Sequence, residues 1–189
     1  MKKFVLLCLI LSLCLVLWGC SDEQPQETVH QHSYVQGVCS SCSEAQPNYK
    51  PLLSCSWTAA GLTSDGEELG VVSLWFYEWG SEITADYYEP LESKDKATQD
   101  YYLQEEPGNL FDFGGKKYYN RGLGVTWGMK YEEQGDTVVI TVEDGMIIGT
   151  FKMVRTAADQ YTITEVAGTI INSTITSCLQ VDCVFTAED

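Results

Sequence analysis

The chain has 189 residues, 44% of them hydrophobic, which suits one globular domain with accessory segments and excludes wholesale disorder. Its formal net charge of −16 argues against nucleic-acid binding, because phosphate contacts require clustered Lys and Arg, and the largest basic cluster is Lys116-Lys117. A strongly acidic surface favours solubility, and it is also able to attract cationic partners.

Residues 1–19 have the pattern of a secretory signal peptide. Lys2 and Lys3 give a positively charged start, and an apolar run of fifteen residues follows from Phe4 to Trp18. A run of this length is short for a transmembrane helix and typical of a signal sequence.

The run ends in 17-LWGC-20, which resembles the lipobox of bacterial lipoproteins. Leu17, Gly19 and Cys20 match that pattern, and Trp18 stands where a small residue is usual. The resemblance implies cleavage before Cys20, a diacylglyceryl anchor on its sulfur, and an extracytoplasmic protein held at the cell membrane. The alternative is an uncleaved anchor. Residues 20–29 then form a polar, flexible tether.

Residues 30–51 contain both histidines of the chain and begin with 30-HQHSYVQGVCSSC-42. His30, His32, Cys39 and Cys42 are four ligands of the kinds that tetrahedral zinc prefers, and a Cys-x-x-Cys turn brings two thiolates to one ion. Four protein ligands leave no open coordination position, so the pattern predicts a structural zinc ion and not a catalytic one.

This segment resembles the small zinc-ribbon-like knuckles that follow the lipobox in lipoproteins of gut Firmicutes. The matching residues are His32, Tyr34, Gly37, Val38, Cys39, Cys42, Pro47, Asn48 and Tyr49. His30 replaces a cysteine of the family pattern, and Ser43 replaces a glycine. A Cys39–Cys42 disulfide is the main alternative in an oxidising exterior. Catalytic redox chemistry is disfavoured, because prolines at 47 and 51 leave no supporting helix.

Residues 52–189 show alternating β-branched and aromatic runs separated by Gly, Asp and Asn, which predicts an all-β domain. The predicted strands are 54–60, 69–78, 82–88, 109–113, 116–120, 124–132, 136–143, 146–155, 160–166, 168–176 and 181–186. Short turns such as Asp144-Gly145 join them into an antiparallel meander, either an up-and-down β-barrel or a β-sandwich. The polar segment 92–109 is expected to be a short helix or a long loop, and is a candidate lid.

The domain resembles the lipocalin-like members of the calycin group of barrels. The resemblance rests on Trp57 near the start of the first strand, the aromatic strand 71–79, and the order of Tyr, Gly-Asp and valine-rich segments in 126–145. Cys55 occupies the position of the usual glycine two residues before that tryptophan. The resemblance implies an up-and-down barrel over about residues 52–187.

Aromatic residues concentrate in the middle of this domain, and alternate positions of a barrel strand face its interior. A ligand pocket for a small apolar or sugar molecule is therefore one hypothesis; the other is that the aromatics fill the core or pack at the rim. The candidate pocket residues are Trp75, Tyr77, Trp79, Trp127 and Tyr131.

Three further cysteines lie in the β-domain. Cys178 and Cys183 flank a four-residue turn and are candidates for a disulfide, and either one is alternatively able to pair with Cys55. The cysteine count after removal of the signal and lipidation of Cys20 is odd, so at least one sulfur stays outside any intrachain disulfide.

The β-domain contains no histidine, which argues against Ser-His-Asp and Cys-His catalysis. The sequence therefore predicts a non-enzymatic, membrane-anchored lipoprotein whose barrel binds a ligand or a protein partner. Two alternatives are an envelope interaction module with a packed barrel, and, as the weakest, a hydrolase that uses paired carboxylates.

Overall fold

The computed structural model describes residues 31–64, 66–122, 124–144, 147–170 and 173–188. The predicted signal peptide (1–19), Cys20 with the tether (20–29) and His30 lie outside these residues. Among the described residues, no helix has both the length and the apolar character needed to cross a bilayer.

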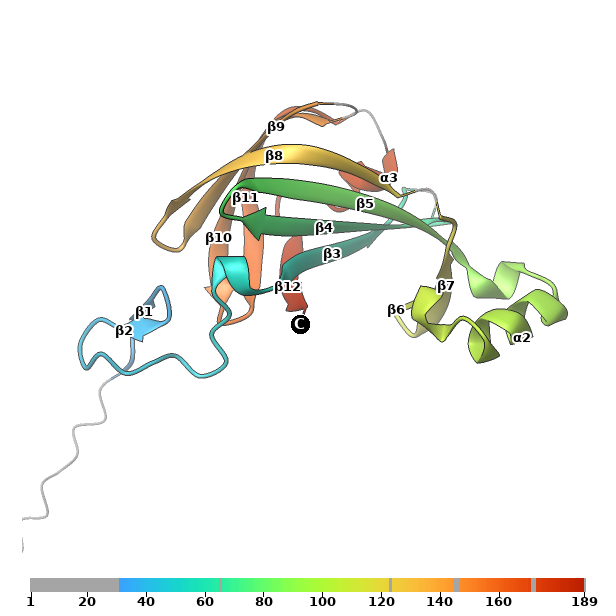
Figure 1. Cartoon of the computed structure of the whole chain (residues 1–189), viewed down its shortest axis with the longest axis horizontal. Helices are drawn as coiled ribbons and strands as arrows, with labels where there is room; N and C mark the ends of the chain where they lie inside the picture. Colours follow the sequence, from blue (N-terminus) through green and yellow to red (C-terminus); the bar gives the residue numbers. More distant parts are fainter. Residues whose placement is uncertain (1–30, 65, 123, 145–146, 171–172, 189) are drawn as a thin grey trace, which may run out of the picture. The chain divides into compact units, whose positions relative to one another are not determined.

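The dominant feature is an antiparallel β-sheet that closes on itself (Figure 1). The strands pair in the order β4-β3-β12-β11-β10-β9-β8-β5, and β5 pairs again with β4 along nine residue positions, which closes the ring. The barrel strands are β3 (Ser56–Leu62), β4 (Leu69–Tyr77), β5 (Gly80–Pro90), β8 (Val125–Gln134), β9 (Thr137–Asp144), β10 (Ile147–Ala157), β11 (Gln160–Ile170) and β12 (Val184–Glu188). The predicted all-β barrel is thus confirmed, and the sandwich alternative is wrong because no open edge remains between β4 and β5.

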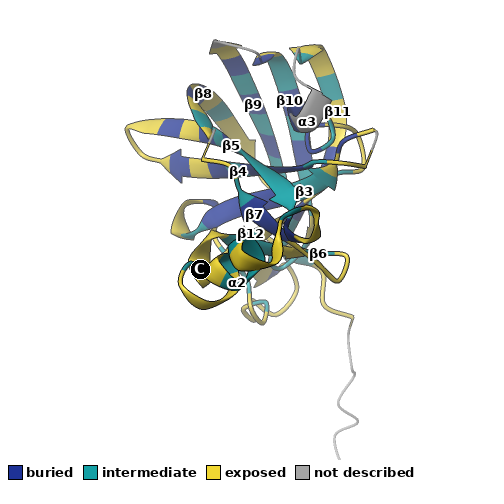
Figure 2. Cartoon of the chain, turned by 90° about the vertical axis from the view of Figure 1, so that its right-hand side faces the viewer, coloured by how far each residue is buried: buried dark blue, intermediate teal, exposed yellow. Residues whose placement is uncertain are grey.

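The clearest predicted element, the β9–β10 hairpin, shows why the barrel forms. Val138, Ile140 and Val142 of β9 alternate with less buried residues, and all three lie in the core. Across the pair, Ile140 faces Phe151 of β10, which is also fully enclosed. Figure 2 shows the alternation of buried and less buried residues as bands along the barrel strands. The period of two in the sequence therefore sets which side chains fill the barrel.

The barrel interior is filled by large apolar side chains that form one continuous cluster. Its fully enclosed members include Trp57, Leu74, Ile83, Ile140, Ile147, Phe151, Met153, Tyr161, Ile163, Ile175 and Phe185. Rings pack edge to face within it, as in Trp57 and Tyr161, whose centroids are 4.7 Å apart. Burial of side chains of this size is the main source of the barrel's stability.

Between β5 and β8 the chain leaves the barrel and returns. This excursion consists of η2 (Leu91–Ser93), α2 (Lys96–Gln104), η3 (Pro107–Asn109), β6 (Leu110–Phe113) and β7 (Lys116–Asn120). The predicted helix in segment 92–109 is confirmed as α2, which begins where Asp95 accepts hydrogen bonds from the backbone and hydroxyl of Thr98. The lid role of this segment stays a prediction.

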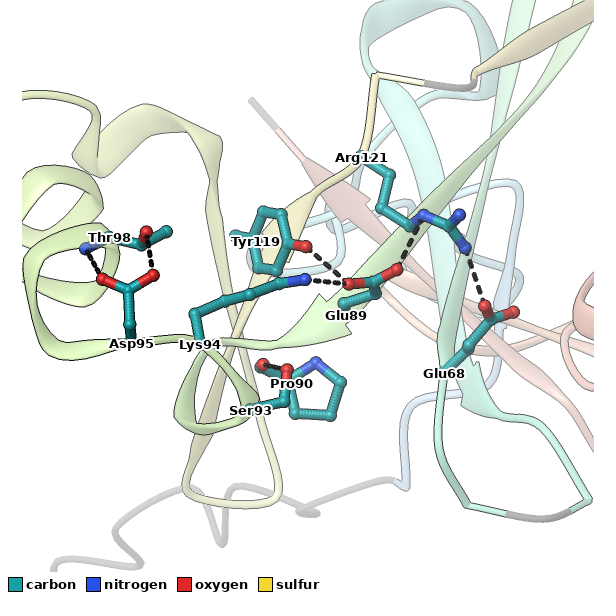
Figure 3. Close-up of polar contacts among 9 residues, drawn as sticks. All are labelled: Glu68, Glu89, Pro90, Ser93, Lys94, Asp95, Thr98, Tyr119 and Arg121. Atoms are coloured by element: carbon teal, nitrogen blue, oxygen red, sulfur yellow. Dashed lines mark hydrogen bonds and ion pairs between the residues drawn. The ribbon is translucent and has the colours of Figure 1, made fainter.

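The excursion is held to the barrel by packing and by one carboxylate. Figure 3 shows Glu89 of β5 accepting from Lys94 (2.8 Å), Tyr119 (2.5 Å) and Arg121 (2.9 Å), while Arg121 also bonds Glu68 at 2.8 Å. Hydrogen bonds from Lys94 and Tyr119 lower the pKa of Glu89, because they favour its charged form.

One predicted strand is wrong. Residues 168–176 do not form a strand of their own: β11 extends to Ile170, and Ser173–Thr176 form the short helix α3. The reason lies at Gly168, which has φ +120° and faces Gly149 of β10. Without side chains at these two positions the strands come so close that a Cβ at Gly168 would overlap the carbonyl oxygen of Ile148, so the glycine marks a close approach and not a break.

Candidate metal centre

The N-terminal knuckle is built on a two-stranded hairpin, β1 (Tyr34–Val35) and β2 (Val38–Cys39). Gln36 and Gly37 form its turn with φ values of +48° and +76°, the two positive values that a type I′ turn needs. A Cβ at Gly37 would overlap the ring of Tyr49, so this position needs glycine for space as well as for conformation. The hairpin delivers Cys39 at the end of β2.

A second tight turn carries the chain from Cys39 to Cys42. The amide of Ser43 donates to the carbonyl of Cys39 (2.9 Å), and the amide of Cys39 donates to the carbonyl of Glu44 (2.8 Å). Ser43 has φ +62°, the left-handed conformation that glycine adopts without strain. The turn is therefore formed with serine at this position, at a modest conformational cost.

The structure brings three of the four predicted ligands together. The ligand atoms of His32, Cys39 and Cys42 all lie within 4.8 Å of one another. Zinc–sulfur bonds of about 2.3 Å and zinc–nitrogen bonds of about 2.0 Å place the ligand atoms of one tetrahedral ion about 3.5–3.8 Å apart, so the set fits a single ion after side-chain adjustments of up to about 1 Å. The fourth predicted ligand, His30, lies outside the described residues. The predicted convergence of ligands is confirmed for the other three, and the zinc ion itself stays a prediction.

The surroundings of Cys42 are set by two neighbours, Cys39 and Glu44. A backbone hydrogen bond at Glu44 lowers the pKa of Cys42, but desolvation, the neighbouring Cys39 thiol and the charge of Glu44 outweigh it, so the net shift of this pKa is upward. Cys39 is buried and Cys42 exposed. The Glu44 carboxylate lies 3.9 Å from the sulfur of Cys42. The Cys-x-x-Cys pattern does not indicate this acidic neighbour, because Glu44 lies outside it.

The knuckle is joined to the barrel through Tyr49 and Lys50. The guanidinium of Arg155, on β10, lies 4.4 Å from the ring centre of Tyr49 and 4.3 Å from that of Tyr161. It also donates to the carbonyls of Lys50 (3.0 Å) and Ala158 (2.8 Å) and to the hydroxyl of Tyr161 (2.7 Å). One side chain thus ties the knuckle's last residues to the barrel wall. No sequence motif marks it, because its partners come from three separate segments.

Tyr161 and Trp57 complete this junction beneath Arg155. Burial raises the pKa of Tyr161 to about 12, although the adjacent guanidinium acts in the opposite direction. The indole of Trp57 donates to the carbonyl of Leu52 at 3.0 Å and holds the short helix η1 (Leu52–Ser54) against the barrel. The tryptophan on which the lipocalin resemblance rests therefore has a structural task at the start of β3.

The five residues predicted to line an interior pocket do not come together. Trp75 and Tyr77 are 38% and 43% exposed and Trp79 is 91% exposed, whereas Trp127 is buried and Tyr131 packs on the ring of Phe76. The placement expected for Trp75 and Tyr77 is wrong because Leu74 and Phe76 take the inward positions of β4, and Trp79 lies beyond the strand, in the turn to β5. The alternation of β4 thus turns the tryptophan and tyrosine outward.

The cysteines of the β-domain are thiols in the structure, so the predicted Cys178–Cys183 disulfide and its Cys55 alternative are not formed there. Cys178 donates to the carbonyl of Gly70 at 3.1 Å, and burial raises its pKa to about 12. Cys183 lies near the carbonyl of Ser177, at 3.8 Å, and burial raises its pKa as well.

Fold and site together define an eight-stranded antiparallel β-barrel preceded by a Cys/His knuckle with a metal-binding donor set. Comparison with family models, with curated proteins and with solved structures finds no match to this chain. The resemblances to knuckle-bearing lipoproteins and to lipocalins therefore stay predictions.

Proposed function

We propose that this chain is an extracytoplasmic lipoprotein, anchored to the cell membrane through Cys20, whose barrel is a non-enzymatic binding module. The observation that carries the proposal is the convergence of His32, Cys39 and Cys42 in a knuckle at the start of the barrel. With a fourth protein ligand, for which His30 is the first candidate and Glu44 the second, this donor set would hold one structural zinc ion.

The barrel's interior supports a role for its outer surface. Side chains as large as Trp57, Phe151 and Phe185 fill the inside and belong to one packed cluster. An interior of this kind favours the interaction module over a barrel that encloses a ligand. The absence of histidine from residues 52–189 supports a non-enzymatic role.

Metal analysis tests the knuckle. The full chain, purified without chelator, is expected to contain one zinc ion per molecule, and Cys39→Ser is expected to remove it. Cys55→Ser is the matched control, because this cysteine is half-buried in the barrel and outside the donor set. Zinc-free protein in which Cys39 and Cys42 form a disulfide would contradict the metal assignment.

Cell fractionation tests the anchor. Cys20→Ser is expected to release the protein from membranes, because a single unlipidated tether offers no stable attachment. Cys42→Ser serves as the control and is expected to stay in the membrane fraction. Membrane association that survives loss of Cys20 would overturn the lipoprotein assignment.

A further inference from the structure

Strand β4 is apolar on both faces, and only part of its outer face is covered. The inward residues Leu74 and Phe76 belong to the barrel core. On the outer face, Leu69 and Val71 form a separate cluster with Tyr118 of the excursion. The outer face therefore has a protein cover over the first half of the strand, and the second half continues beyond it.

The uncovered half ends in three exposed aromatic side chains, which we call the aromatic face: Trp75, Tyr77 and Trp79. Trp75 and Tyr77 alternate on β4, so their rings lie on the same side of the sheet. Trp79 follows in the β4–β5 turn and is 91% exposed. Exposed Trp and Tyr in one patch are typical of an interaction surface, since such rings contribute most of the energy in many interfaces.

An open depression of about 310 Å³ lies on the adjoining part of the sheet. It is lined by Gly80, Ser81, Gly128, Met129, Lys130, Thr141 and Glu143. Gly80 is the cross-strand partner of Tyr77, so the depression begins beside the aromatic face. A Cβ at Gly80 or Gly128 would have no neighbour within 4 Å, which explains the depression: two outward positions have no side chain.

The charges beside the aromatic face are mainly negative. Glu82 is the cross-strand partner of both Trp75 and Gly128, and Glu78 stands between Tyr77 and Trp79 in sequence. Both carboxylates are exposed, and neither forms an ion pair with any residue that the structure describes. Lys130, a cation in the lining of the depression, is 3.1 Å from Glu143 and is thus already paired with a carboxylate.

We propose that the aromatic face and its depression bind a basic polypeptide segment through arginine side chains, which deepens the proposed function by naming the partner's chemistry. A guanidinium stacks on the flat rings of Trp75 or Trp79 while its N–H groups bond the carboxylate of Glu82. The net charge of −16 raises the local concentration of a cationic partner and repels an anionic one. Exposed carboxylates without ion pairs beside aromatic rings favour this partner over a neutral ligand.

The test uses the full chain in detergent and a fluorescent peptide of alternating Arg and Gly. At about 0.15 M salt, where distant charges are screened, Trp75→Ala combined with Trp79→Ala is expected to weaken binding about tenfold. Gly128→Phe fills the depression from an open outward position, so it is expected to preserve the fold and weaken binding by about the same factor. A peptide with lysine in place of arginine is expected to bind more weakly.

The matched control removes an aromatic ring and a carboxylate elsewhere. Tyr101→Ala with Glu105→Gln, both exposed on or next to α2, is expected to change affinity less than about twofold. A control variant that loses as much peptide affinity as the variants of the aromatic face and its depression would mean that binding is general charge attraction, and would overturn the proposal. So would a neutral oligosaccharide that quenches these tryptophans when the peptide does not.

Failure of this inference is distinct from failure of the proposed function. If the wild-type chain does not bind the peptide, but contains zinc and attaches to membranes through Cys20, only the assignment of the aromatic face is contradicted.

Discussion

The junction at Arg155 gives the most quantitative prediction. Arg155→Met removes three hydrogen bonds, to the carbonyls of Lys50 and Ala158 and to the Tyr161 hydroxyl, and the contacts with the rings of Tyr49 and Tyr161. Each bond contributes about 1 kcal/mol net, and stacking on two rings adds about 1 kcal/mol. Relief from burying the charge offsets part of this sum, so we expect a loss of about 3 kcal/mol in the free energy of unfolding.

Urea unfolding of the purified chain, followed by tryptophan fluorescence, measures this loss. Lys152→Met is the matched control: it removes a cation from the same strand, but its 2.7 Å ion pair with Glu165 is exposed and contributes at most about 1 kcal/mol. Arg155→Lys keeps the charge without the planar fork and is expected to lose most of what Arg155→Met loses. An Arg155→Met protein within about 0.5 kcal/mol of wild type would refute the junction's importance.

Three further predictions concern the barrel. Glu89→Gln is expected to lower the free energy of unfolding by about 1–2 kcal/mol at neutral pH. Because the folded pKa of Glu89 is lowered from 4.5, the stabilising contribution of this carboxylate is present above that value and is lost as pH falls below it, so thermal unfolding curves of mutant and wild type should converge in acid. Gly168→Ala is expected to cost about 2–4 kcal/mol, whereas Gly128→Ala, with open space at its Cβ, should be nearly neutral; equal melting temperatures would refute the close approach. Cys178 is expected to react with a thiol reagent only in denaturant, since its pKa of about 12 and burial keep it protonated; absence of reaction even there would indicate the Cys178–Cys183 disulfide.

The sequence predicts the barrel well where one face of each strand is polar. In β9, Val138, Ile140 and Val142 alternate with less buried residues, so period and inward face follow from the same pattern. In β4, periodicity alone cannot choose the inward face, because residues on both faces are apolar. The placement of Trp75 and Tyr77 failed for this reason: the excursion covers the outer face of the first half of β4, and only the fold reveals that cover.

The sequence predicts the knuckle because the knuckle depends on local geometry. Gly37 and the Cys39–Cys42 spacing specify two tight turns, and these turns alone bring the cysteines together. Arg155 was not predictable, because its role depends on carbonyls and rings that are contributed by distant parts of the chain. The same is true of Glu44, which gains its position only when the second turn forms.

The most direct test of the central claim, a closed structural metal centre, is the absorption spectrum of the full chain loaded with Co²⁺ in place of zinc. A tetrahedral site with two thiolates is expected to show intense visible bands and sulfur-to-metal charge transfer in the near ultraviolet, and Cys42→Ser should reduce the charge transfer. The weak spectrum of octahedral, water-coordinated Co²⁺ in the wild-type chain would contradict the account.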